Sequence, residues 1–126
     1  MKNICRIDKS IYECITKNIK TDEVIITNER INHINEHHPN SYDIIYPFLS
    51  KALEAPDYIL EDKKYKDTGL VLKNITDNNV RMQVVLKIQT SSENPEYKNS
   101  IISAWQISES RWENYIKNRK ILYKSK

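Results

Sequence analysis

Residues 69–88, GLVLKNITDNNVRMQVVLKI, decide the fold because they hold two strand patterns on either side of one turn. The turn is DNN at 77–79, residue types that adopt turn geometry readily. After it, apolar residues recur at every second position from Val80 to Ile88, which is the period of a strand with one buried face. The stretch therefore predicts a β-hairpin whose second strand has one core face and one partly hydrated face. The predicted core residues include Met82, Val84 and Leu86.

Further strand patterns lie on both sides of the hairpin. Residues 57–62, DYILED, and 100–107, SIISAWQI, are rich in β-branched and aromatic residues. Ser108 can then cap a last helix, because apolar and aromatic residues follow it at helical spacing. The residues that share one side of this helix are Trp112, Tyr115, Ile116 and Arg119.

The first half of the chain favours helices. Thr-Asn at 27–28 can cap a helix over residues 29–38, and Pro39 ends it because the residue before a proline avoids the α conformation. A second helical pattern covers residues 40–55, with Pro47 as either a kink or a new first turn.

The N-terminal stretch at 3–15, NICRIDKSIYECI, favours two short strands around a turn at Asp8 and Lys9. The whole chain is then α+β, with N-terminal short strands and helices packed on an antiparallel β-sheet and with a C-terminal helix. Its length of 126 residues predicts one domain, 1–126.

Composition narrows the class of protein. The chain is 39% hydrophobic and 29% charged, which is typical of a globular domain, and its apolar runs are far shorter than the roughly 20 residues of a membrane span. The N-terminus lacks an apolar signal core, so we expect a cytoplasmic protein and no membrane partner. A disulfide between Cys5 and Cys14 stays open, but reduced structural thiols are favoured in that compartment.

Positive charge is concentrated at the C-terminus. Residues 108–126 carry six basic side chains against two glutamates, whereas the whole chain has a net charge of only +3. Such a cluster, with a basic tail at about 117–126, can face phosphates. A solvated helix face and a frayed tail are the simpler interpretation of the same charges.

All three histidines lie in residues 26–39, ITNERINHINEHHP. At 100° per residue, Arg30, His33 and His37 fall within about 60° of one another and form a polar stripe beside an apolar one. His38 points more toward the buried side, which favours a role as a helix cap or a packing residue.

Three interpretations of the stripe compete. Histidines four apart on a helix can bind zinc, but His33 lacks a following glutamate and no third ligand is evident, so we expect neither a metal nor a cofactor. Imidazole titrates near neutral pH, so His33 or His37 can transfer protons while Arg30 binds an anion. The simplest alternative is that these are polar residues of a solvated helix face.

The order of several motifs resembles a known family. TDEVIITNERINHINEHHP at 21–39, APDYI at 55–59, MQVVLKI at 82–88 and YKNSIISAWQISESRW at 97–112, followed by a basic end, resemble the phage- and mobile-element-associated Barnase-EndoU-colicin-RelE-like (BECR) nucleases. The resemblance extends from about residue 4 to the end. It implies N-terminal helices on an antiparallel sheet and metal-independent cleavage of RNA, which would make the protein a ribonuclease.

The resemblance also implies roles for particular residues. In metal-free cleavage of RNA one group takes the proton of the 2′-hydroxyl, another stabilises the phosphorane and a third protonates the leaving oxygen. His33 would be the base or acid and His37 its partner, while Lys87 would stabilise the phosphorane. Arg30 would hold the substrate phosphate.

The remaining candidates lie nearer the C-terminus. Ser103 matches a position where the family tends to carry a serine or threonine and would bind a phosphate oxygen, while Trp105 can stack on a base, although a core tryptophan is the commoner role. Lys117 and Arg119 would contact RNA phosphates. Each also has a purely structural explanation, such as a solvated lysine or a half-buried strand hydroxyl.

A different class of function remains open: a catalytically inactive nucleic-acid-binding or virion-associated accessory protein that keeps the fold. If the protein is an enzyme, we expect four residues to converge on one concave, electropositive surface, namely Arg30, His33, Lys87 and Ser103. If these residues lie far apart, the inactive protein is favoured. RNA is the expected partner. The sequence leaves open the RNA target, a phage or immunity protein as a further partner, and the oligomeric state.

Overall fold

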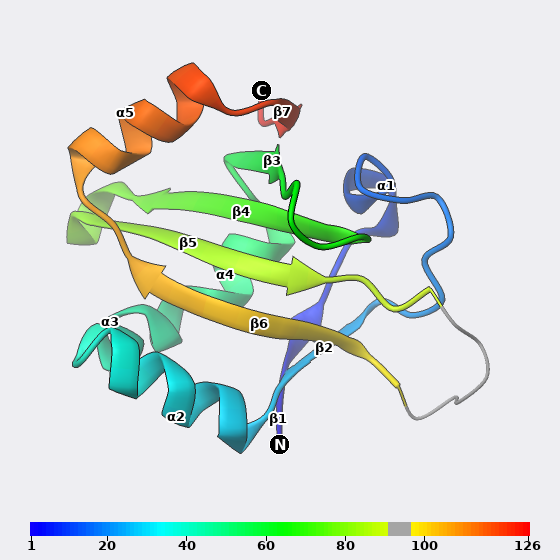
Figure 1. The fold of residues 1–126 in the computed structure, drawn as a ribbon, viewed down its shortest axis with the longest axis horizontal. Coiled ribbons are helices and arrows are strands. Elements are labelled where there is room, and N and C mark those ends of the chain that lie inside the picture. The colour runs from blue at the N-terminus through cyan, green and yellow to red at the C-terminus, as the bar shows by residue number, and fades with distance from the viewer. Residues whose placement is uncertain (91–96) are drawn as a thin grey trace.

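The computed structural model describes residues 1–90 and 97–126, which form a seven-stranded sheet with helices on both faces (Figure 1). The strand order is β1-β2-β6-β5-β4-β3-β7. The strands are β1 (Lys2–Arg6), β2 (Glu23–Ile26), β3 (Tyr58–Glu61), β4 (Thr68–Ile75), β5 (Val80–Lys87), β6 (Asn99–Gln106) and β7 (Ile121–Lys124). The helices are α1 (Lys9–Tyr12), α2 (Asn28–His37), α3 (Ser41–Ile45), α4 (Leu49–Glu54) and α5 (Glu109–Asn118), with 3₁₀ turns η1 (Tyr46–Phe48) and η2 (Thr76–Asn78).

The predicted hairpin is confirmed. β4 and β5 pair antiparallel from Ile75↔Val80 to Thr68↔Lys87, and Asn79 takes a left-handed conformation at the turn, with φ of 53°. Asparagine tolerates that region better than most residues, which explains why the chain reverses there. The three predicted core residues Met82, Val84 and Leu86 are completely buried.

The predicted α+β class is also confirmed, with one refinement of the sheet. Its pairs are antiparallel except β2 with β6, which run parallel through Val24↔Asn99 and Ile25↔Ser100. Parallel neighbours need a long crossover connection. The chain between β2 and β6 contains α2 to α4 and the β3–β4–β5 meander, so the parallel pair joins segments that are far apart in sequence.

The N-terminal stretch differs from the prediction. β1 forms as expected, but Asp8 caps α1 by accepting a hydrogen bond from the Ser10 amide at 2.9 Å, and no second strand follows. Asp8 is both a good turn residue and a good helix cap, and burial decides between these roles. Tyr12 on α1 is fully buried and donates a hydrogen bond to the Leu53 carbonyl at 2.7 Å.

The histidine helix forms where the sequence predicts it. Thr27 caps α2 by accepting a hydrogen bond from the Arg30 amide, and α2 ends at His37, two residues before Pro39. The second helical pattern is divided at Pro47, which lies in the first turn of η1 between α3 and α4. Proline therefore starts a new turn here.

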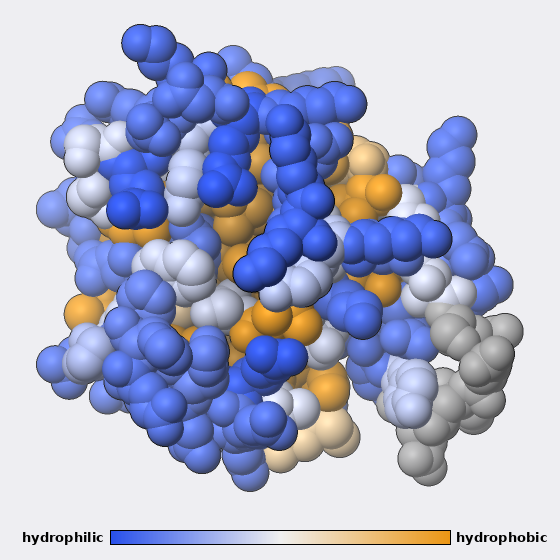
Figure 2. Space-filling view, viewed as in Figure 1, coloured by the Kyte–Doolittle hydropathy of each residue, from blue (hydrophilic) through white to orange (hydrophobic). Residues whose placement is uncertain are grey.

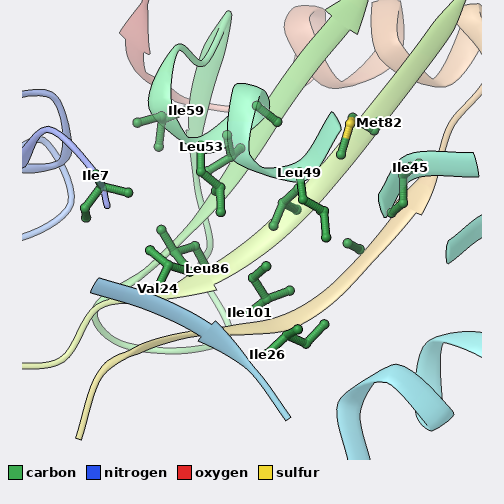
Figure 3. Close-up of a cluster of buried hydrophobic side chains, with 14 of the residues drawn as sticks. Ile7, Val24, Ile26, Ile45, Leu49, Leu53, Ile59, Met82, Leu86 and Ile101 are labelled. Carbon is green, nitrogen blue, oxygen red and sulfur yellow. The ribbon is translucent and has the colours of Figure 1, made fainter. Parts of the chain in front are cut away.

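Two hydrophobic cores lie on opposite faces of the sheet. The first is covered by α2 to α4, and Figure 3 shows Leu49 and Leu53 of α4 gathered with Met82 and Leu86 of β5. The second lies under α5 and contains the buried side chains Leu60, Leu70, Leu72, Ile107 and Tyr115. The other face of β5 is partly exposed at Arg81, Val85 and Lys87, as predicted, but Gln83 on the same face is buried.

The C-terminal residues form a strand where a basic tail was expected. β7 pairs antiparallel with β3 at one edge of the sheet, through Tyr58↔Lys124 and Ile59↔Tyr123. Tyr123 packs against the first core, which holds the strand in place. Only three apolar residues, at 121–123, lie between Lys120 and Lys124. The flanking positive charges therefore favoured the prediction of a solvated tail over that of a strand.

Two further findings concern the class of protein. Within the described residues, no helix has the length and apolar character needed to cross a bilayer. Cys5 and Cys14 are both free and partly buried. Burial and the nearby Glu54 carboxylate raise the pKa of the Cys5 thiol to about 12.

Candidate functional site

A cavity of about 510 Å³ lies on the α5 face of the sheet. Its floor comes from neighbouring strands, because Gln83 of β5 is paired with Leu72 of β4 on one side and with Trp105 of β6 on the other. Residues of the β3–β4 connection and the end of α5 form its walls. The lining residues are Glu61, Asp62, Lys63, Lys64, Leu70, Gln83, Val85, Trp105, Tyr115, Asn118, Arg119 and Lys120.

Gln83 is an exception among the buried residues on this floor. Its side chain is 2% exposed, and its Oε1 atom has no hydrogen-bond partner within residues 1–90 and 97–126. An unpaired buried amide costs about 1–3 kcal/mol of stability. Such groups in folded proteins are commonly explained by an ordered water molecule, an ion or local strain.

Trp105 joins this cavity to a second hollow of about 300 Å³. The second hollow is lined by His38, Trp105, Gln106, Ile107, Ser108 and Arg111. The rings of His38 and Trp105 stack there with their centroids 4.3 Å apart and their planes 8° from parallel. This contact joins the C-terminal end of α2 to β6 beside the cavity.

The environment of His38 favours its neutral form. Partial burial against Trp105 lowers the pKa of His38 from 6.5, and the positive charges of His37, His33 and Arg111 lower it further. A neutral imidazole can accept a proton at neutral pH.

Basic side chains surround the cavity. Lys63 and Lys64 come from the β3–β4 connection, while Arg119 and Lys120 follow α5. The Arg119 guanidinium lies 4.7 Å from the centre of the Tyr115 ring, and Lys120 forms an ion pair with Glu61 at 3.8 Å. Figure 2 shows apolar surface lying between the hydrophilic regions that α5 and α2 occupy in Figure 1.

The polar stripe of α2 faces a different hollow. Arg30 and His33 line a depression of about 240 Å³ together with Glu29, Asn32 and Glu36, and both are exposed. The rings of His33 and His37 lie side by side, with centroids 4.3 Å apart. The predicted stripe therefore exists, but neither Arg30 nor His33 lines the cavity on the sheet.

The other predicted residues lie in different places relative to the cavity. Trp105 and Arg119 line the cavity, and Ser103 is paired with Val85 on its floor. Lys87 is exposed and lies four residues along β5 from Gln83, roughly 13 Å at the rise of a strand. Lys117 is exposed on α5 and does not line the cavity. The four residues expected to converge do not share one cavity.

Sequence reasoning missed two residues of this site. The alternation of β5 places Gln83 on the partly hydrated face, and nothing in the neighbouring sequence indicates that its side chain is buried. His38 was correctly predicted to cap α2 and pack, since it is the C-cap residue and stacks on Trp105. Its position beside a cavity depends on β6, which is about 60 residues away in the chain.

No group of three histidine, cysteine, aspartate or glutamate side chains in the described part of the chain is arranged to hold a metal ion.

Comparison with known proteins identifies the family of the chain. No curated protein and no solved structure matches the chain. The model of the family described as phage-Barnase-EndoU-ColicinE5/D-RelE like nuclease2 matches residues 5–124. Because that match covers nearly the whole chain, the protein belongs to the phage-Barnase-EndoU-ColicinE5/D-RelE like nuclease2 family and carries a nuclease-like domain.

Proposed function

We propose that the protein is a metal-independent endoribonuclease whose active site lies where the end of α2 meets the cavity on the α5 face. The observation that carries this proposal is the stack of His38 on Trp105, because it joins a histidine with a lowered pKa to a cavity bordered by cations. Single-stranded RNA can enter such an open site with its bases unstacked.

The chemistry follows from the groups available. Neutral His38 takes the proton of a ribose 2′-hydroxyl, and the 2′-oxygen attacks the adjacent phosphorus. The bond from phosphorus to the 5′-oxygen breaks, and a protonated group donates a proton to that leaving oxygen. The products are a 2′,3′-cyclic phosphate and a 5′-hydroxyl, so atoms and charge balance without a metal.

The other candidate residues have supporting roles in this scheme. His33 and His37 lie on α2, the helix that ends beside His38, and are the candidates for the acid, while Arg30 would bind a phosphate further along the RNA. Arg119 and Lys117 would hold phosphates near α5. Ser103 and Lys87 lie toward the far side of the same sheet face, where they would contact a neighbouring nucleotide.

The test is cleavage of single-stranded RNA in EDTA, with mapping of the fragment ends. We expect His38→Phe to keep the stack on Trp105 but to reduce cleavage roughly 10²- to 10⁴-fold, the usual effect of losing a general base. His33→Ala and His37→Ala, each tested alone, identify the acid. Asn35→Ala, on the exposed surface of the same helix, is the matched control.

The result that would reject this proposal is full activity in His38→Phe. Loss of wild-type cleavage in EDTA, with recovery on adding Mg²⁺ or Zn²⁺, would reject metal independence instead. Melting temperatures of every variant separate lost chemistry from lost folding.

A catalytically inactive nucleic-acid-binding protein is the second candidate. The separation of Arg30 and His33 from the cavity favours it, since the residues expected to act together line different hollows. This function predicts RNA binding by the wild type without any cleavage products, under conditions where the nuclease would act.

A further inference from the structure

The proposed reaction needs a cation beside His38, and the lysine expected from the sequence is poorly placed for that role. The phosphorane formed by attack of the 2′-oxygen is more negative than the starting phosphate, and without a metal the side chains must offset that charge. Lys87 is four residues along β5 from Gln83, which pairs with Trp105. That separation is roughly 13 Å at the rise of a strand, which is longer than a lysine side chain.

Arg111 of α5 lies where the cation is required. It lines the hollow of about 300 Å³ together with His38 and Trp105, so the guanidinium and the imidazole border the same space. Burial lowers the pKa of His38 most, and the positive charge of Arg111 is among the groups that lower it further. The guanidinium is therefore close enough to interact with the imidazole, although the two side chains belong to helices on either side of β6 in the chain.

Arg111 is also free to bind an anion. In the described part of the chain, Arg6 and Arg81 form ion pairs with carboxylates, whereas no carboxylate forms one with Arg111. Its Nη1 atom lies 3.5 Å from the hydroxyl oxygen of the buried Tyr115, and its guanidinium carbon lies 5.9 Å from the centre of that ring. This contact positions an exposed side chain. The other N–H groups can reach two oxygens of a phosphate, the bidentate contact that arginine makes well.

We propose that Arg111 binds the scissile phosphate beside His38 and stabilises the phosphorane, as a catalytic residue of this site. The inference rests on the proposed function in taking RNA as the substrate and His38 as the base. Two N–H groups of Arg111 donate hydrogen bonds to the non-bridging oxygens, whose charge grows as the 2′-oxygen attacks phosphorus. An arginine guanidinium stays protonated in proteins, so it neither gives nor takes a proton. The 2′-hydroxyl proton still passes to His38, and the bond from phosphorus to the 5′-oxygen still breaks.

The first test is the rate of RNA cleavage by variants of Arg111. Because the phosphorane is more negative than the bound phosphate, Arg111→Gln should lower kcat roughly 10²- to 10³-fold, the usual effect of removing one charge-stabilising donor, with a much smaller change in KM. Arg111→Lys keeps the charge but not the fork of donors, so its kcat should lie between those of Arg111→Gln and the wild type. Lys51→Gln removes an exposed cation from α4, on the opposite face of the sheet, and as the matched control should leave kcat unchanged.

The second test needs no cleavage and uses sulfate, which has the tetrahedral oxygens of a phosphate and keeps its charge over the range in which histidine titrates. An anion beside His38 favours the charged imidazole, so sulfate should raise the pKa of His38 in an NMR titration, relative to sodium chloride of equal ionic strength. In Arg111→Gln the pKa of His38 should already be higher without sulfate, because one positive charge is gone, and sulfate should raise it far less. Lys51→Gln should respond as the wild type does.

Two results would overturn the assignment of Arg111. One is cleavage that depends on His38 but is unchanged in Arg111→Gln, which would keep the nuclease. The other is a wild-type His38 titration that is the same in sulfate as in chloride. A response to sulfate that requires Arg111, in a protein that cleaves no RNA, would instead reject the nuclease and keep Arg111 as a phosphate-binding residue. If Arg111→Gln lowers the melting temperature, the wild-type response to sulfate and the intermediate activity of Arg111→Lys are the deciding measurements.

Discussion

At the scale of single residues, two side chains beside the cavity lie in environments that are unfavourable for their polar groups. Gln83 is buried without a partner for its oxygen, and His38 is held against Trp105 beside other positive charges. Neither arrangement favours stability by itself. A neutral imidazole at His38 is the form that the proposed reaction requires.

Titration of His38 gives a direct prediction at this scale. Because burial and neighbouring cations lower its pKa, the folded protein binds a proton there less readily than the unfolded chain does. The contribution of neutral His38 to the free energy of unfolding should be fully present above the unfolded-state pKa of about 6.5. It should be lost as the pH falls below that value and through the lower pKa of the folded state.

The measurement is the NMR titration of His38, together with urea unfolding at several pH values. We expect a midpoint below 6.5 and a fall in stability as the pH drops below about 6.5 that is smaller in His38→Phe. A midpoint at or above 6.5 would contradict the neutral base. It would then remove the reason for assigning proton abstraction to His38.

At the scale of elements, packing decided the two ends of the chain. Asp8 and its neighbours suit a turn as well as a helix cap, and burial of Tyr12 selects the helix. The C-terminal residues suit a solvated tail as well as a strand, and the exposed edge of β3 selects the strand. In both places local propensity is weak and tertiary contacts outweigh it.

β7 can be tested with neighbouring substitutions. Tyr123→Ala should reduce the free energy of unfolding by about 2 kcal/mol, because Tyr123 packs against the first core. Lys124→Ala, on an exposed residue of the same strand, should change it by less than about 0.5 kcal/mol. Urea denaturation measures both, and two neutral variants would indicate a free tail.

At the scale of the whole molecule, the arrangement of charge matters more than its total. The net charge is only +3, yet the cavity is bordered by cations from two separate parts of the chain, the β3–β4 connection and the end of α5. Glu61 and Asp62 offset part of that charge. The fold therefore produces a local basic surface that neither segment could form alone.

The corresponding prediction concerns the salt dependence of RNA binding. Each phosphate contact to single-stranded RNA contributes about 0.7 to the slope of log affinity against log salt. We expect replacement by glutamine of the four cavity cations to reduce the slope by up to about 3. These residues are Lys63, Lys64, Arg119 and Lys120.

The matched control removes the same charge elsewhere. It replaces four exposed lysines that do not line the cavity, namely Lys9, Lys17, Lys20 and Lys51. An equal loss of slope in both variants would show that binding follows net charge alone. A third variant, at Lys117 and Lys124, tests whether exposed cations beyond the cavity contribute.

By itself, the sequence determined the elements whose signal is local. The alternation from Val80 to Ile88 with its DNN turn specified the β4–β5 hairpin, and capping residues with Pro39 set the limits of α2. The order of motifs was sufficient for the family. Periodicity, capping and turn chemistry act between residues a few positions apart, so they can be recognised along the chain.

Only the tertiary structure decided that Gln83 is buried, where the last residues pair, and which histidine lies beside the cavity. The stack of His38 on Trp105 joins residues far apart in sequence, and Gln83 is buried where its β-sheet partners are Leu72 and Trp105 of the neighbouring strands. Such contacts arise when separate elements bury their apolar faces together, and no local pattern encodes that choice. The candidate site is therefore a product of packing, assembled from residues whose individual patterns predicted only strand, helix cap and solvated loop.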